Sequence, residues 1–312
     1  MTKYRNKLPQ TNGNLFITDG GLETTLIFHN EIDLPYFAAF DLLKDEAGIK
    51  AIENYYRTYM DIALRDKRGF VLESCTWRAS SDWGEKLGYT RETLADANRK
   101  SIWLLENLRE ENETATTPMV LSGCIGPRGD GYDAGDLMTE AQAQAYHAQQ
   151  IDVFADTAAD LVTGVTMTNA PESIGIVKAA QQAQIPAVIS FTVETDGNLP
   201  AGDSLGDAIR AVDAATDNGP AYFMINCAHP THFDGSLPGD EDWVQRIAGL
   251  RTNASKRSHA ELDEAEDLDD GNPVELGDLH GQLRRRFGQI SVMGGCCGTD
   301  HRHIAEMSRA CR

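Results

Sequence analysis

The sequence predicts a single-domain (β/α)8 barrel. Eight short runs rich in apolar and β-branched residues recur along the 312-residue chain. Longer segments with a helical pattern separate these runs, and near-continuous apolar strands joined by helices indicate a parallel sheet covered on both faces. Eight such units in a chain of this length fit one barrel, and a doubly wound open sheet is the alternative.

Each expected strand ends in glycine, proline or small polar residues, which interrupt the apolar run. The first strand, NLFITDGG at 14–21, ends in a glycine turn, and the second, GFVLESCTW at 69–77, follows a helical stretch at 46–67. In chain order, further strands are expected at 118–127, 159–167, 185–194, 221–230, 247–255 and 289–299, and further helices at 91–112, 139–157, 171–183 and 204–217. The seventh strand has the weakest pattern.

One acidic segment interrupts this alternation, at about 255–280. It carries nine carboxylates between Glu261 and Asp278. The spacing of these carboxylates does not match an EF-hand loop. The segment is therefore expected to be a solvated insertion after the seventh strand, within one domain that spans residues 1–312.

The charge of the chain limits its partners. It has 28 basic and 48 acidic side chains, which give a net charge of −20. Such a field repels nucleic acid and anionic membrane surfaces, so neither is an expected partner. The opening MTKYRNKLPQTNGN has no apolar signal core, and no apolar run approaches the ~18 residues of a membrane span. A cytoplasmic protein is expected.

Polar residues at the expected strand ends point to a site, because the chemistry of such barrels gathers at the carboxyl ends of their strands. Asp19, Gly20 and Gly21 end the first strand, and Ser74 and Thr76 lie at the end of the second. Cys227 ends the sixth strand, and Cys296 and Cys297 end the eighth. Strands six and eight are near neighbours around a barrel, so these three thiols are expected to converge.

Three thiols with one open position suit a catalytic zinc ion. Glycines around the cysteine pair would let the chain leave strand geometry, so that both sulfurs turn to one ion. Unrelated buried cysteines and redox chemistry are the two alternatives. The remaining cysteines are expected to lie in the core or at the terminus, and four histidines in loops or at helix starts: Cys75, Cys124, Cys311, His229, His232, His301 and His303.

Short motifs along nearly the whole chain carry a resemblance. These are TDGG near the N-terminus, SGCIGP, SFTVETDGNLPAGDSL, INC and GGCCGT. Together, over about 14–308, they resemble the zinc-dependent homocysteine S-methyltransferase family. The resemblance implies a barrel enzyme with zinc on Cys227, Cys296 and Cys297 and with the homocysteine thiolate as fourth ligand. It also implies a small methyl donor with a sulfonium or quaternary ammonium centre, and DGGLETTL is most similar to the S-methylmethionine branch.

The resemblance also implies where the substrates bind. The amino-acid head of homocysteine would lie near Asp19, Gly20 and Gly21, with help from Ser74 and Thr76. At the end of the fourth strand, family members commonly carry a Glu-Thr pair whose glutamate holds the substrate ammonium. Here LVTGVTM places Val165 at the glutamate and retains Thr166, which leaves Asp19 or another acid for the ammonium.

A second departure concerns the donor. LPYFAAF places Phe37, with Tyr36 beside it, where the family usually has tryptophan. Aromatic rings bind cations through their faces, so Phe37, Trp77 and Trp83 are expected near the methyl donor. The alternative functions are methyl transfer to another small thiol and a non-catalytic metal-binding or redox-sensing barrel that uses Cys296 and Cys297.

Overall fold

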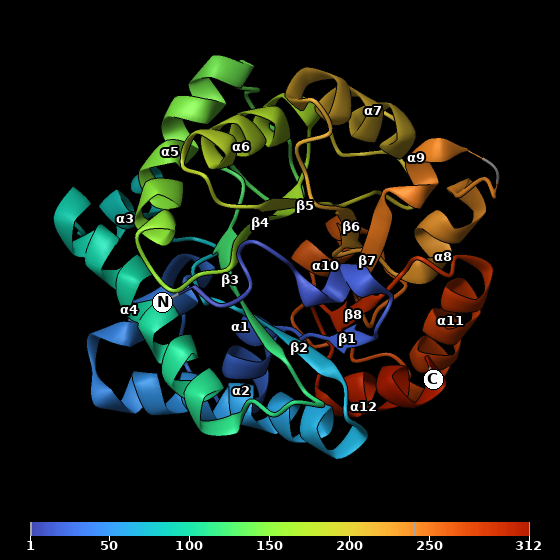
Figure 1. Cartoon of the computed structure of the whole chain (residues 1–312), viewed down its shortest axis with the longest axis horizontal. Coiled ribbons are helices and arrows are strands. Elements are labelled where there is room, and N and C mark those ends of the chain that lie inside the picture. The colour runs from blue at the N-terminus through green and yellow to red at the C-terminus, as the bar shows by residue number, and fades with distance from the viewer. Residues whose placement is uncertain (1, 240, 312) are drawn as a thin grey trace.

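Eight parallel strands close into a barrel, in the order β1 to β8, in the computed structural model, which describes residues 2–239 and 241–311 (Figure 1). The strands are β1 Phe16–Ile17, β2 Gly69–Glu73, β3 Met119–Ile125, β4 Leu161–Met167, β5 Ala187–Phe191, β6 Phe223–Asn226, β7 Ile247–Thr252 and β8 Val292–Gly295. Each lies within a predicted strand, and the predicted (β/α)8 fold is confirmed. Among the described residues, no helix is both long and apolar enough to span a bilayer.

Helices surround the strands on the outside (Figure 1). The α-helices of the described residues, of which α1 and α10 lie outside this ring, are α1 Leu22–Thr24, α2 Glu46–Asp66, α3 Ser81–Lys86, α4 Arg91–Asn112, α5 Glu140–Ala155, α6 Ala170–Gln182, α7 Leu205–Thr216, α8 Pro230–Phe233, α9 Asp242–Gln245, α10 His259–Asp263, α11 Pro273–Arg286 and α12 His301–Ala310. The five predicted helices correspond to α2 and α4–α7. At the start of each of these helices, the side chain of the residue before it accepts a backbone N–H of the first turn. These capping residues are, in chain order, Asp45, Thr90, Thr139, Asn169 and Ser204. Such a cap stabilises a helix by about 1 kcal/mol.

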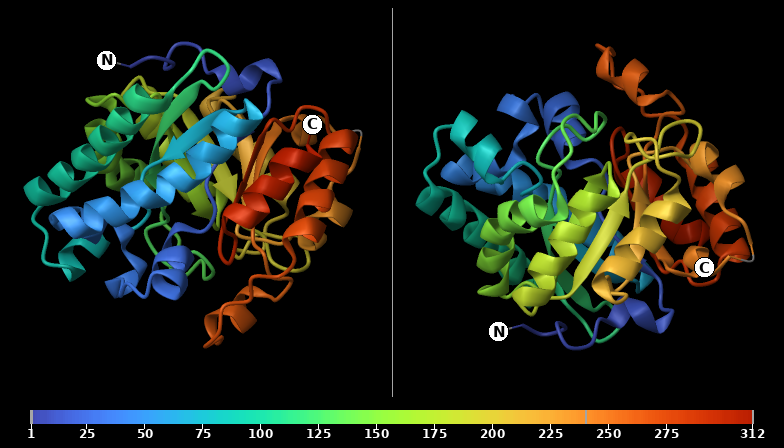
Figure 2. Two further views of the ribbon diagram at one scale, coloured as in Figure 1. Left: turned by 90° about the horizontal axis from the view of Figure 1, so that it is seen from below. Right: turned by 90° about the horizontal axis from the view of Figure 1, so that it is seen from above.

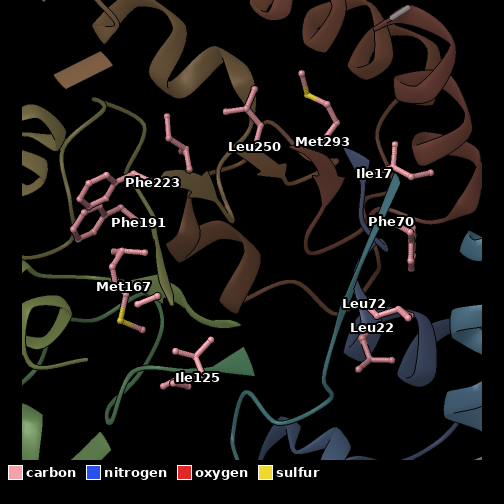
Figure 3. Close-up of a cluster of buried hydrophobic side chains, with 14 of the residues drawn as sticks. Ile17, Leu22, Phe70, Leu72, Ile125, Met167, Phe191, Phe223, Leu250 and Met293 are labelled. Carbon is pink, nitrogen blue, oxygen red and sulfur yellow. The ribbon is translucent and has the colours of Figure 1, made fainter. Parts of the chain in front are cut away.

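The apolar core has two parts because strand side chains alternate between two faces. Side chains such as Ile17, Phe70 and Leu72 belong to the larger cluster, between strands and helices (Figure 3). A smaller cluster includes Phe16, Val71, Val120, Leu161, Val188, Met224 and Val292. Two residues further along five of these strands are buried polar side chains: Glu73, Ser122, Thr163, Ser190 and Asn226. On this face of the strands, the polar side chains thus lie toward the carboxyl ends and the apolar cluster toward the amino ends.

The acidic segment divides into two structural parts. Its first part contains α10, which projects beyond the barrel (Figure 2). Its last part, from Pro273 onward, belongs to α11, which begins where Asn272 accepts two backbone N–H groups. The carboxylates of Glu275 and Asp278 are thus on a helix of the outer ring, and the sequence pattern did not separate this helix from the irregular stretch before it.

Candidate active site

Three cysteine sulfurs meet beside the carboxyl ends of β6 and β8. The Sγ atom of Cys227 lies 3.0 Å from that of Cys296 and 3.6 Å from that of Cys297. All three sulfurs lie within 4.8 Å of one another, and they form a group able to hold a metal ion. Tetrahedral zinc with Zn–S bonds of ~2.3 Å places its sulfurs ~3.8 Å apart. The distance from Cys227 to Cys297 is close to this value, and the distance from Cys227 to Cys296 is shorter than it.

The backbone adopts a left-handed conformation at two non-glycine residues of the site. Cys227 has φ 55° and Thr166 has φ 62°. Such residues are strained by about 1 kcal/mol or more, and strain of this kind persists where the surroundings impose it. At Thr166 the Asn226 side chain holds this conformation, because its Oδ1 accepts the Thr166 N–H at 2.9 Å and the Ser190 hydroxyl at 2.6 Å, and its Nδ2 donates to the Thr166 hydroxyl at 2.8 Å.

Replacing Asn226 with alanine is expected to destabilise the chain by about 2–4 kcal/mol, because it leaves buried partners on Thr166 and Ser190 unpaired. Urea unfolding measures the loss. Asn198→Ala is the matched control, since the Asn198 side-chain amide bonds, among the described residues, only the nearby Asp196 carboxylate in the same loop. Equal losses in the two variants would show that Asn226 does not organise the site.

The glycines of GGCCGT were expected to let the chain leave strand geometry, and only one of them has a backbone conformation that requires glycine. Of the three, only Gly298 has a positive φ, of 77°. Gly295 belongs to β8, and a Cβ there would lie 1.9 Å from the Thr299 hydroxyl oxygen. Close packing between the strand and the following turn therefore explains Gly295. β8 ends at Gly295, directly before the cysteine pair, and Gly298 turns the chain directly after it.

Tyr132 contacts two of the sulfurs and His259 supports it from behind, and the sequence did not indicate either residue. The Tyr132 hydroxyl lies 3.3 Å from Cys227 Sγ and 3.5 Å from Cys297 Sγ. Its ring stacks on His259, with centroids 4.1 Å apart. The His259 ring nitrogens lie 2.8 Å from the Cys227 carbonyl oxygen and 3.0 Å from the Glu194 carboxylate. The acidic segment thus contributes one buried side chain to the support of the cysteine cluster.

A buried arginine lies beside the same cluster. Arg251 donates to the Asp19 carboxylate at 2.7 Å, to the Glu73 carboxylate at 2.5 Å and to the Gly295 carbonyl at 3.2 Å. Burial raises the pKa of Asp19 to about 6, although the Arg251 charge opposes that shift. Hydrogen bonds from Cys227 and Cys297 hold the pKa of Cys296 well below that of an ordinary thiol, and Arg251 adds to this effect. One cation therefore serves two carboxylates and the sulfur cluster.

A cavity of about 290 Å³ opens onto this network. Most of the residues predicted to bind metal, acceptor or donor line it: Asp19, Gly20, Gly21, Phe37, Ser74, Trp77, Thr166, Cys227, Cys296 and Cys297. Thr76 does not line it, because its hydroxyl lies behind Ser74 at 2.6 Å and donates to the Cys124 carbonyl at 2.8 Å. Trp83 also lies outside the lining and donates to the Arg128 carbonyl. Val165 and Glu23 both line the cavity.

A closed (β/α)8 barrel that brings three cysteines together at the carboxyl ends of its strands, in a group able to hold a metal ion, has the architecture of a barrel enzyme. A family model described as homocysteine S-methyltransferase matches residues 16–311. The chain belongs to the homocysteine S-methyltransferase family, as its motifs predicted. The predicted enzyme class, a methyltransferase with homocysteine as acceptor, is confirmed at the level of this family.

Relatives align along most of the chain. Selenocysteine Se-methyltransferase of Brassica oleracea var. italica is 24% identical over 317 residues, which cover 94% of this chain and 88% of the relative. Homocysteine S-methyltransferase 1 of the same plant is 23% identical over 319 residues, with 95% and 93% covered. The metallated form of the homocysteine methyltransferase MmuM of Escherichia coli superposes with a TM-score of 0.76 at 18% identity, with 98% and 99% covered. The last likeness concerns the fold.

Proposed function

We propose that the chain transfers a methyl group from S-methylmethionine to the thiol of homocysteine, with zinc held by Cys227, Cys296 and Cys297. One observation carries the proposal: three sulfurs from two strand ends lie within 4.8 Å of one another in the wall of a cavity. A set of three protein ligands is typical of a catalytic zinc site, which keeps its fourth position for substrate.

The cysteines and their neighbours would prepare the acceptor sulfur. When bound, zinc would supply deprotonation of an acceptor thiol, whose ordinary pKa is ~8.5. Three protein thiolates bring negative charge into a buried place, and the Arg251 guanidinium compensates part of it from the adjoining strand. The Asn226 amide lies 3.9 Å from Cys296 Sγ, with its Nδ2 directed to that sulfur.

Residues at the ends of β1, β2 and β4 would hold the amino-acid part of homocysteine. Gly20, Gly21, Ser74 and Thr166 line the cavity, and Asp19 does so with one oxygen committed to Arg251 and the other to the Tyr55 hydroxyl at 3.0 Å. Thr76 would act through Ser74, whose position its hydroxyl fixes.

Phe37 and Trp77 would face the methyl donor. The Arg78 guanidinium carbon lies 4.1 Å from the Trp77 ring centroid, and the indole N–H donates to the Val165 carbonyl at 3.1 Å. One face of Trp77 is therefore already taken by a cation, whereas no cation of the described residues lies over Phe37, so Phe37 offers a sulfonium an aromatic ring without a competing charge. Holding donor and acceptor in line contributes at best about 7–11 kcal/mol.

The proposal predicts methionine formation by the zinc-loaded chain from homocysteine and S-methylmethionine, loss of that activity on chelation, and recovery on adding zinc. Methionine is measured by mass spectrometry. Parallel reactions test betaine as donor and cysteine or selenocysteine as acceptor. Turnover with another acceptor alone would replace homocysteine in the proposal. A metal-free chain whose cysteines titrate with oxidant, without methyl transfer, would support the redox-sensing barrel instead.

A cytoplasmic location is part of the proposal. All six cysteines are free thiols, and three of them must stay reduced to bind a metal. Reducing compartments maintain this state. The partners of the proposed reaction are small molecules, the thiol and the methyl donor.

A further inference from the structure

The carboxylates that line the cavity differ in whether the protein neutralises them. Asp19 and Glu73 share the Arg251 guanidinium. Asp130 lies 3.5 Å from the Arg78 guanidinium. These three acids thus have a cationic partner within the protein, and none of them is free to pair fully with a charged ligand.

Glu23 is the exception inside the cavity. It is a half-buried residue of α1, and its carboxylate makes no hydrogen bond or ion pair with any other residue in the described part of the chain. Burial raises the pKa of Glu23 to about 7, and the negative charges of Cys296 and Asp19 add to the effect. A carboxylate in such a place is unfavourable until a cation joins it. Asp263 also lines the cavity without a partner, but it is exposed on α10, where solvent screens it.

The end of β4, which also lines the cavity, lacks the acid that the family resemblance implies. Val165, an apolar side chain only 7% exposed, stands at that position and lines the same cavity as Glu23. The cavity therefore has an apolar surface where an ammonium site is expected, and an unpaired carboxylate elsewhere on its lining. We propose that Glu23 binds the ammonium group of the acceptor amino acid. This inference rests on the proposed function.

The position of Glu23 favours the acceptor over the donor. Glu23 follows Gly21 by two residues, and a Cβ on Gly21 would lie 2.6 Å from the Cys296 carbonyl oxygen. The turn that carries Glu23 is therefore packed directly against the cysteine pair. In homocysteine only two methylene groups separate the sulfur from the carbon that bears the ammonium. A thiol whose sulfur lies at the cysteines can thus bring its ammonium within reach of this turn.

Glu23→Gln tests the inference with two thiols that differ only in the amino group, homocysteine and 4-sulfanylbutanoate. The variant is expected to raise KM and the calorimetric dissociation constant for homocysteine about 10- to 100-fold, the usual effect of losing one charged hydrogen bond. The values for 4-sulfanylbutanoate are expected to change less than about twofold, because that thiol has no ammonium to lose. Glu110→Gln is the matched control, since Glu110 is exposed on α4, and it is expected to leave both thiols unchanged.

Other outcomes overturn the inference. Equal weakening of both thiols, no weakening of either, or an effect confined to KM for the methyl donor would each assign Glu23 another role. The melting temperature separates misfolding from ligand binding, because removing an unpartnered carboxylate should leave it equal or higher. If the wild-type chain methylates no thiol, the proposed function fails, and the calorimetric comparison of the two thiols still decides whether Glu23 recognises the amino group.

Discussion

Replacing Cys296 with serine is expected to reduce bound zinc from about one ion per chain to almost none, and to lower methyl transfer by about 10³-fold or more. Cys296 is the sulfur closest to Cys227, at 3.0 Å, and it is also the thiol whose pKa is held lowest. A serine hydroxyl at the same position stays protonated at neutral pH and is a poor zinc ligand. Metal analysis after exhaustive dialysis and the methyl-transfer assay measure the two effects.

Cys311→Ser provides the control for this variant. Cys311 is also a buried free thiol, but it follows α12 and lies outside the cavity lining. The Cys311→Ser protein is expected to keep its zinc and its activity, with at most a loss of stability. A Cys296→Ser protein that retains a full equivalent of zinc would refute the assignment of the three cysteines as the ligand set.

Replacing Arg251 with methionine is expected to give the largest loss of stability, about 3–5 kcal/mol, because it leaves two carboxylates without their buried cation. Asp19 and Glu73 are both less than 5% exposed, so solvent cannot replace the guanidinium. Urea unfolding measures the free energy. Arg99→Met is the control, since Arg99 pairs with Asp96 on the surface, where such a change is worth less than about 0.5 kcal/mol.

The loss in Arg251→Met is expected to depend on pH. The pKa of Asp19 is already raised to about 6 with Arg251 present, and removing the guanidinium raises it further. In the unfolded chain the pKa of an aspartate is ~3.9. An acid whose pKa is higher in the folded chain lowers the free energy of unfolding as the pH rises from the unfolded pKa through the folded pKa. The difference between variant and wild type should therefore be smaller near pH 5 than near pH 8. A difference that is constant with pH would show that the two carboxylates are not the source of the instability.

The barrel and the cysteine cluster could be predicted from sequence because both follow from strand ends. Parallel strands bring their carboxyl ends to one rim, so Cys227, Cys296 and Cys297 were expected together although 69 residues separate the first two along the chain. Arg251 lies in the weakest predicted strand, and its neighbours Asp19 and Glu73 come from strands far away in sequence. No local sequence pattern predicts that the Arg251 guanidinium bridges the Asp19 and Glu73 carboxylates.

Loop residues of the site could not be predicted for a different reason. Tyr132 lies in the irregular stretch between β3 and α5, where no periodicity fixes the direction of a side chain. His259 lies within an acidic segment whose composition indicates solvent, and yet it is only 4% exposed. Thr76 follows the end of β2, and it is fully buried with its hydroxyl bonded to Ser74 and to the Cys124 carbonyl. In each case tertiary contacts, rather than spacing, decide which atoms face the ligand.

The shortness of β1 has a consequence for motion. Only Phe16 and Ile17 pair with β8, and the seam continues through single backbone bonds from Gly295 N–H to the Asp19 carbonyl and from Gly21 N–H to the Thr299 carbonyl. Those last bonds join the turn that carries Glu23 to the segment that carries the cysteine pair. A ligand that contacts both segments would join β1 to β8 where the barrel has its shortest strand pairing. Hydrogen exchange of the backbone amides along this seam should therefore slow when the ligand binds.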